Sequence, residues 1–330
     1  MLLTALKAVA ESTRLTIVVV LSRGELSVNE LAHVLGQSQP RVSRHLRLLV
    51  EAQVLERNQE GANALYGLAR SGTAAKLAEH VLTLVDTATP ELEQALARLQ
   101  RLQDERDREA AAYFERLAED WDAFRDRVVG ESVVEARIVD LLEAAPVNDL
   151  LDLGTGTGRI LEVAAPYTRN GLGIDLSTEM LRIARAKLQS QGLSHCQVRK
   201  GDVNALNVPA GSADVAVLHH VLHFLDHPDR AIAEAARTLR PGGRLIVVDF
   251  APHQSDVLRT QHAHRRMGFS DAEVERWCHD ADLVDVRVEH LDASPDVVVC
   301  AGTENAGLTI SIWSAVQHSD APSHYRLEVA

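Results

Sequence analysis

The sequence predicts an α/β protein in two folded parts: an N-terminal winged helix–turn–helix and a C-terminal, mostly parallel β-sheet covered by helices. Three observations predict this fold. Short helices and then a hairpin fill the first 89 residues, apolar strands alternate with helices after about residue 146, and a charged helical stretch separates the two regions. We therefore divide the chain into a first domain at 1–89, a helical linker at 90–145 and a second domain at 146–330.

Composition limits the class of protein. At ~150 residues per domain, 330 residues suggest about two domains, and 46% hydrophobic with 25% charged residues is ordinary for a globular chain. The apolar run from Leu15 to Leu21 is far shorter than the ~20 residues that span a bilayer. No leader-like segment precedes it, so we expect a cytoplasmic protein. The three cysteines are too widely spaced for a disulfide framework or a metal cluster.

Charge is distributed unevenly along the chain. The formal net charge is −13, but residues 1–89 carry nine Lys and Arg against eight Asp and Glu, and the rest of the chain carries −14. The acidic remainder of the chain repels nucleic acid. The nearly neutral first domain, residues 1–89 (the head), can still bind DNA if its positive side chains are clustered.

The first domain contains start and stop signals for two consecutive helices. Ser27 and Glu30 have the spacing of a capping box, and they open a helix that Gly36 ends. Ser38 and Pro40 start the next helix, which runs to about residue 52. Extended runs at 54–58 and 64–68 follow, with Gly61 in the turn, and they predict a two-stranded wing.

The second of these helices has one basic and one apolar face. Arg41 and Arg44 share a face with His45, while Val42, Leu46 and Leu49 point the other way and dock the helix. An ordinary amphipathic helix with a solvated basic face would look similar. The complete order of helix, turn, helix and hairpin favours recognition of the DNA major groove, with Arg donating to guanine. The candidate DNA-binding residues are Ser38, Gln39, Arg41, Ser43, Arg44, His45, Arg47 and, on the wing, Arg57 and Asn63.

At residues 2–88 the sequence resembles the ArsR-type winged-helix repressors. Three segments carry the resemblance: Leu6 to Leu15, Glu25 to Leu31 and Gln37 to Leu46. The resemblance implies a homodimer formed through the first and last helices, which reads two half-sites on double-stranded operator DNA about one helical turn (~34–36 Å) apart. Metal-sensing members carry cysteines where this chain has residues 27–29, and serine or asparagine cannot replace thiolates as ligands of soft metals. We therefore expect no metal sensing in this head.

The linker is predicted to be helical and strongly charged. It carries fifteen acidic residues and eight arginines. Leu92, Leu96 and Leu99 form an apolar seam that stops at Gln103, and two heptads are too few to indicate a coiled coil. An amphipathic connecting helix is the prediction.

The second domain alternates strands and helices, which is typical of a parallel sheet with helices on both faces. Helices are expected at about 177–191 and 228–239. The predicted strands are Asp149–Leu153, Gly171–Asp175, Cys196–Lys200, Ala213–His219 and Leu245–Phe250.

The first predicted strand runs into a glycine-rich turn and then a helix. Gly154, Gly156 and Gly158 let the backbone approach a ligand where a Cβ would collide. Asp175 ends the next strand 21 residues after Gly154, close to the ~20 residues expected for a ribose-binding carboxylate. The spacing is G-x-G-x-G, and the dinucleotide form is G-x-G-x-x-G, so NAD is the weaker candidate.

From about residue 113 onward the sequence resembles the class I S-adenosylmethionine-dependent methyltransferases, whose fold is Rossmann-like. The segments that carry the resemblance are Asp149 to Gly158, Gly173 to Ser177, Gly201 to Val203, His219 to His223 and Leu239 to Leu245. It implies that S-adenosylmethionine or S-adenosylhomocysteine binds at the glycine turn. For Asp152 and Asp202 the alternative is capping of their loops. The implied cofactor-binding residues are Asp152, Gly154, Gly156, Gly158, Asp175, Leu176, Met180, Asp202, Val203 and His219.

The methyl acceptor is not evident from the sequence. The fourth strand is not followed by an N/D-P-P-Y/F/W segment, which argues against methylation of DNA bases, and the cysteines lack the clustering expected of an arsenic methyltransferase. Histidine has a pKa near working pH, so His220 and His223 are the candidate general bases. Metal binding is a less favoured alternative, and no metal site is predicted. Histidines on the acceptor side are His220, His223, His227, His253, His262 and His264.

Two functions follow from this organisation. The first is a transcriptional regulator, with a methyltransferase-like domain that senses S-adenosylmethionine or S-adenosylhomocysteine. The fused architecture resembles S-adenosylhomocysteine-responsive repressors. The second is an active methyltransferase of a small molecule, with a winged helix that serves dimerisation or self-regulation. The regulator is the favoured hypothesis, because a DNA-binding domain implies control of gene expression.

Overall fold

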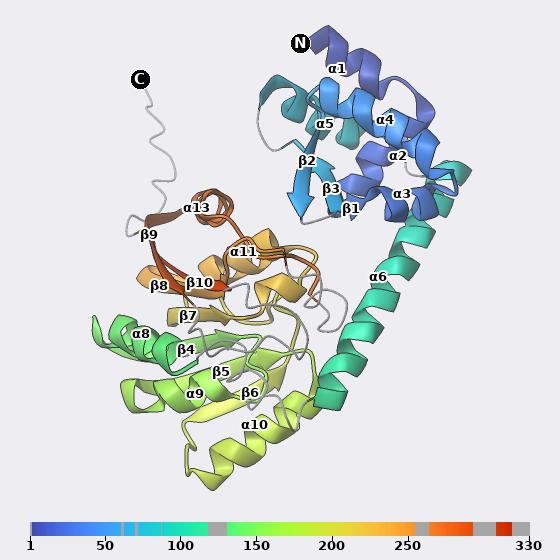
Figure 1. The fold of residues 1–330 in the computed structure, drawn as a ribbon. Helices are drawn as coiled ribbons and strands as arrows, with labels where there is room; N and C mark the ends of the chain where they lie inside the picture. Colours follow the sequence, from blue (N-terminus) through green and yellow to red (C-terminus); the bar gives the residue numbers. More distant parts are fainter. Residues whose placement is uncertain are drawn as a thin grey trace, which may run out of the picture. The chain divides into compact units, whose positions relative to one another are not determined.

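The computed structural model describes residues 2–60, 63–69, 72–86, 88–117, 131–254, 264–292 and 308–318. The chain forms two compact units, Met1–Ala110 and Ala111–Ala330, and each is described by itself (Figure 1). Among the helices that the structure describes, none combines the length and apolar character needed to cross a membrane.

The first unit consists of short helices and a three-stranded antiparallel sheet with the strand order β1-β3-β2. The helix–turn–helix and the two-stranded wing are confirmed. Its elements are α1 (Leu2–Val9), α2 (Ser12–Leu21), β1 (Leu26–Ser27), α3 (Val28–Leu35), α4 (Gln39–Glu51), β2 (Leu55–Glu60), β3 (Asn63–Leu68), α5 (Gly72–Leu84) and the start of α6 (Pro90–Leu117).

The helix–turn–helix is built by local signals. The Ser27 hydroxyl accepts from the Glu30 N–H, and the Glu30 carboxylate accepts from the Ser27 N–H at 2.8 Å, so the predicted capping box closes α3 at its start. Gly36 ends α3 in a left-handed conformation with φ of 65°, which glycine adopts without a Cβ penalty. The chain then turns into α4 at Ser38.

The beginning of α6 belongs to the core of the first unit. Leu92, Ala95 and Leu99 are buried there at 3–4% exposure. The guanidinium of Arg98 donates to the Val34 carbonyl at 3.4 Å and lies against Gly36. The first turns of the predicted linker therefore contact the turn between α3 and α4.

The second unit is a seven-stranded sheet with the order β6-β5-β4-β7-β8-β10-β9. β4 to β8 pair in parallel, whereas β10 and β9 are antiparallel, so the mostly parallel sheet is confirmed. Its strands are β4 (Val147–Leu153), β5 (Thr168–Asp175), β6 (Cys196–Lys200), β7 (Ala213–His219), β8 (Leu239–Phe250), β9 (Leu283–Asp292) and β10 (Thr309–Gln317).

Helices cover both faces of this sheet (Figure 1). One apolar core joins α8 (Glu131–Glu143), α9 (Arg159–Ala164) and α10 (Thr178–Ser190) to one face, and another joins α11 (Pro228–Thr238) and α13 (Asp271–Asp280) to the opposite face. Two short 3-10 helices, η1 (Ala165–Tyr167) and η2 (Leu222–Phe224), follow α9 and β7. Because parallel neighbours end at the same edge, the loops after β4, β5, β6 and β7 are brought together.

Candidate functional site: a basic helix and a glycine loop

The α4 helix presents the predicted basic face to solvent. Val42, Leu46 and Leu49 are fully buried at 0% exposure and dock the helix on the head core. Ser38, Gln39, Arg41, Arg44 and Arg47 are exposed, and Ser43 is half-buried. The exposed arginines can therefore reach a ligand without unfolding of the helix.

His45 differs from its neighbours on α4. Its Nδ1 lies 3.5 Å from the Glu11 carboxylate, and its side chain is half-buried. Burial is the main reason that the pKa of His45 lies below its ordinary value, and nearby arginines add to this effect against the attraction of Glu11. Glu11 also accepts from the N–H groups of Thr13 and Arg14 at the start of α2. His45 therefore packs the helix against the head, a contact that the sequence prediction did not anticipate.

The wing is a regular hairpin. β2 and β3 pair from Leu55 opposite Leu68 to Glu60 opposite Asn63. Arg57 is exposed on β2, and Asn63 begins β3, with its side chain outside the described residues.

The glycine loop follows β4 and has the backbone of a ligand-binding turn. Gly154, Gly156 and Gly158 have φ of 74°, 52° and 84°, a left-handed region that side-chain-bearing residues rarely adopt. A Cβ at Gly154 would lie only 2.8 Å from Val221 Cβ, and closer still to Cγ2 of the same side chain. A glycine is therefore required here both by the conformation and by the close approach.

Asp175, at the end of β5, is tied to the glycine loop. One carboxylate oxygen accepts from the Gly156 N–H at 2.8 Å, and the other accepts from the Ser177 N–H at 2.8 Å. Burial raises the pKa of Asp175, and these two hydrogen bonds oppose that shift without cancelling it. A carboxylate held in this way is placed to accept from vicinal hydroxyls of a ribose.

The other predicted cofactor residues lie along the same edge. Asp152 is buried and accepts from the Thr155 hydroxyl at 2.5 Å, which also fits the alternative reading of loop capping. Asp202 is exposed two residues after β6 and accepts from the Asn204 N–H at 2.8 Å. The remaining residues divide by exposure: Met180, Val203 and His219 are buried, while Leu176 is 58% exposed.

A cluster of imidazole rings follows β7 and β8. The Nδ1 of His223 lies 2.7 Å from Oδ1 of Asp249, and both side chains are at most 3% exposed. The rings of His223 and His264 stack with centroids 4.0 Å apart, and His219 and His220 meet edge to face at 4.6 Å. The candidate bases are thus brought together with a buried carboxylate. His262 and Cys300 lie outside the described residues.

Asp249 was missed by sequence reasoning. Its signal is a single acidic residue in the otherwise apolar end of β8, at positions 245–250. The N–H groups of Phe250 and His223 donate to its two oxygens at 2.8 and 3.3 Å. Burial raises the pKa of Asp249, but attraction to His223 and His220 and the hydrogen bonds from His223 and Phe250 together outweigh it and hold the pKa below its ordinary value.

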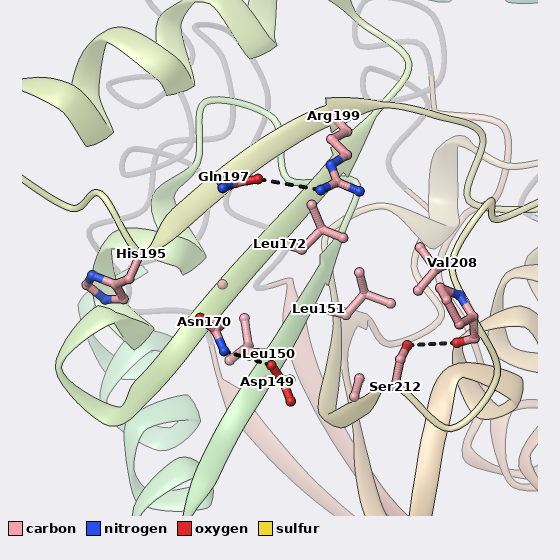
Figure 2. A pocket seen from close by; sticks show the side chains of 13 residues that line it. Asp149, Leu150, Leu151, Asn170, Leu172, His195, Gln197, Arg199, Val208 and Ser212 are labelled. Carbon is pink, nitrogen blue, oxygen red and sulfur yellow. Dashed lines mark hydrogen bonds between the residues drawn. The ribbon is translucent and has the colours of Figure 1, made fainter.

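A separate hollow of about 330 Å³ lies over the amino-terminal and middle parts of β4, β5 and β6 (Figure 2). Leu151 and Leu172 line it together with polar side chains, among them the hydrogen-bonded pair Asp149 and Asn170. This hollow does not include any of the predicted cofactor residues. The glycine loop, at the other end of the strands, is the candidate ligand site because it combines three left-handed glycines with the carboxylate of Asp175.

Two family models match the chain. Residues 11–57 match the model described as "Bacterial regulatory protein, arsR family", and residues 151–247 match the model described as "Methyltransferase domain". The chain is therefore a fusion of an ArsR-family helix–turn–helix and a class I methyltransferase domain, as the sequence predicts.

Curated relatives match part of the chain. Identity is 40% over 121 residues to demethylmenaquinone methyltransferase of Thermus thermophilus, covering 35% of this chain and 53% of the relative. It is 36% over 145 residues to nocamycin O-methyltransferase of Saccharothrix syringae, covering 43% and 51%. The chain thus spans about half the length of these relatives. A demethylmenaquinone methyltransferase of Renibacterium salmoninarum is 28% identical over 198 residues, 58% of this chain and 80% of the relative.

Solved structures are also similar to part of the chain. The YcgJ protein of Bacillus subtilis superposes with a TM-score of 0.47 at 18% identity, over 56% of this chain and 97% of its own. A SAM-dependent methyltransferase of Thermotoga maritima gives a TM-score of 0.48 at 22% identity, over 62% and 99%.

Proposed function

We propose that this protein is a cytoplasmic, DNA-binding transcriptional regulator, with a methyltransferase domain that binds S-adenosylmethionine or S-adenosylhomocysteine as effector. One observation carries the proposal: a head with three exposed arginines on its recognition helix is fused to a glycine loop that Asp175 holds by backbone hydrogen bonds. A ligand-responsive regulator requires a domain that binds operator DNA and a site that binds the ligand, and we propose that this chain combines the two.

The proposed regulator acts as a homodimer. Leu2 and Leu3 on α1 and Leu84 on α5 are 49%, 65% and 83% exposed, and α1 and α5 pack against each other. This apolar surface on the first and last helices of the winged-helix fold supports pairing through those helices. Sedimentation of the full chain measures its mass, and the Leu84→Glu variant is expected to shift it towards the monomer.

DNA recognition is tested with a matched pair of arginine variants. Arg44→Ala removes an exposed donor from the recognition helix, whereas Arg23→Ala removes the same charge from the end of α2. We expect Arg44→Ala to weaken specific binding to the DNA upstream of the gene by about 1–3 kcal/mol, the value of one base-reading side chain. Equal affinity of the two variants would show that α4 does not read the operator.

Effector binding is tested by titrating the same DNA complex with each adenosyl ligand. A ligand shifts DNA affinity only if it binds the two conformations differently, and coupling of ~1–3 kcal/mol corresponds to about 5–150-fold. Asp175→Ala should abolish both ligand binding and the shift, and Asp280→Ala, an exposed acid at the end of α13, should preserve both. A ligand response that survives without ligand binding would refute the sensor.

The second candidate function is methyl transfer to a small molecule. The observation that favours it is the buried polar cluster at the ends of β7 and β8, the acceptor side in the methyltransferase fold. Transfer of labelled methyl groups from S-adenosylmethionine into fractions of a cell extract, lost in Asp175→Ala, would support it. The two functions are compatible, since an enzyme can also report its own product.

A further inference from the structure

We propose that His220, His223 and Asp249 form a binding site for a divalent transition-metal ion of the zinc type. This site lies outside the glycine loop, and the proposal stands whichever function holds. Within the part of the chain that the structure describes, these residues are a buried group whose ligand atoms all lie within 4.8 Å of one another.

The donor set matches the chemistry of such an ion. Two imidazoles and one carboxylate are the protein ligands of many catalytic zinc and non-haem iron sites, which keep further positions open. The His223 Nδ1 and the Asp249 Oδ1 are already 2.7 Å apart. An ion that replaces the proton between these two atoms would be bound by both, and a ring nitrogen of His220 would complete three protein ligands.

The surrounding structure holds these ligands in place. The His223 ring stacks on His264 with an interplanar angle of 27°, and Asp249 is fixed by the backbone N–H groups of Phe250 and His223. His220 has a left-handed backbone with φ of 51°, and its N–H donates to the Val248 carbonyl at 2.8 Å. Strained residues persist only where the surroundings determine them, and they concentrate at functional sites.

The local charges also permit a cation. Two arginines follow His264, and each is paired with an acidic residue: Arg265 with Asp226 at 2.6 Å, and Arg266 with Glu273 at 3.4 Å. Each ion pair therefore partly neutralises its arginine, which reduces the repulsion between these arginines and a cation bound at His220, His223 and Asp249. Asp249 is fully buried, and a buried carboxylate is stabilised by a cationic partner.

The position of the site suggests what the open coordination positions would take. His220 and His223 follow β7, and Asp249 is near the end of β8, on the acceptor side of the sheet. A water molecule or an oxygen or sulfur donor of a small molecule would fill the remaining positions. The class of ligand is therefore a small molecule with a hydroxyl, thiol or carboxylate that can bind a metal ion.

The experiment uses the full chain without a polyhistidine tag, stripped with a chelator and then loaded with Zn²⁺ or Co²⁺. Metal content after desalting is measured by mass spectrometry, and visible d–d absorption of bound Co²⁺ reports nitrogen and oxygen ligands. We expect about one ion per chain in wild type. Loss of even an outer partner weakens metal binding 10–100-fold, so we expect losing a ligand in His220→Asn or Asp249→Asn to cost at least about 100-fold.

His279→Gln is the matched control, because His279 is an exposed histidine at the end of α13 in the same unit. His220→Asn should stay folded, because asparagine tolerates a left-handed backbone. Circular dichroism verifies its fold. Zn²⁺ should raise the thermal midpoint of wild type and of His279→Gln but not of His220→Asn. Metal-free wild type, or equal loading of wild type and His220→Asn, would overturn the proposal.

Discussion

Replacing Gly154 with alanine tests whether the glycine loop has the left-handed backbone and the close approach to Val221 that require a glycine. Gly154 has φ of 74°, and a left-handed conformation costs a side-chain-bearing residue roughly 1–2 kcal/mol. The new Cβ would also lie 2.8 Å from Val221 Cβ, and overpacking of this kind costs about 1–3 kcal/mol. The free energy of unfolding of Gly154→Ala should therefore fall by about 2–5 kcal/mol.

The two contributions can be separated by a double-mutant cycle. Val221→Gly removes the three side-chain atoms that lie nearest to the new Cβ, but it leaves the cost of the left-handed backbone at position 154 unchanged. The cost of Gly154→Ala measured in the Val221→Gly background should therefore drop to that of the left-handed backbone alone, about 1–2 kcal/mol. Matching costs in both backgrounds would show that the two residues are not in contact.

The assay is urea unfolding followed by tryptophan fluorescence. Residues 1–110 contain no tryptophan, and Trp277 and Trp313 are buried in the second unit, so the signal does not come from the head. A Gly154→Ala protein with a free energy of unfolding within about 0.5 kcal/mol of wild type would refute this loop geometry, because surface substitutions without a special role fall in that range.

Three further predictions concern the helix cap at Ser27, the carboxylate of Asp214 and the contact between Arg98 and Val34. Ser27→Ala should lower head stability by about 0.5–2 kcal/mol in thermal unfolding, because it opens the capping box of α3. Burial raises the pKa of Asp214, but hydrogen bonds from the Asp149 N–H and from Arg240 outweigh it and lower that pKa, so this carboxylate stabilises the fold above pH ~3.9 and loses its effect as pH falls through its folded pKa. Asp214→Asn should thus cost about 1–3 kcal/mol at neutral pH and progressively less below pH ~4 in urea titrations, and a constant difference would contradict this. Arg98→Ala removes the contact of α6 with Val34. We expect this variant to bind the adenosyl ligand with unchanged affinity but to show a smaller effect of the ligand on DNA affinity. An unaltered ligand effect in a gel-shift titration would exclude coupling through this contact.

Local signals explain which elements could be predicted from the sequence. β6 and β7 have the predicted bounds because each is a short run between turns. β8 begins at Leu239, six residues earlier than predicted, because residues 241–243 read as a turn although Leu239 pairs with Ala213 before the register shifts. The strands β9 and β10 were not predicted. β9 alternates apolar and charged residues at an edge of the sheet, where one face is solvated and its apolar signal is weak.

The site residues that could not be predicted depend on contacts between distant segments. The glycine loop and Asp175 follow from spacing, because two neighbouring parallel strands place them at one edge. The pairing of His223 with Asp249 joins residues 26 positions apart and exists only because β7 and β8 are neighbours. His45 was predicted on the exposed face of α4, yet Glu11 from the start of α2 draws it towards the head. Periodicity places a residue on a helix face, but it does not show which other helix is nearby.

Thermodynamic reciprocity separates the two proposed functions more sharply than an activity measurement does. If an adenosyl ligand weakens operator binding by a given factor, operator DNA must weaken binding of that ligand by the same factor. An enzyme that uses its winged helix only for dimerisation has no such coupling, and its ligand affinity should not respond to DNA. Calorimetric titration of ligand into the free protein and into the DNA complex therefore measures the same coupling free energy, now as a change in affinity for the adenosyl ligand. A ligand affinity that is indifferent to operator DNA would favour the methyltransferase, even if the protein binds that DNA tightly.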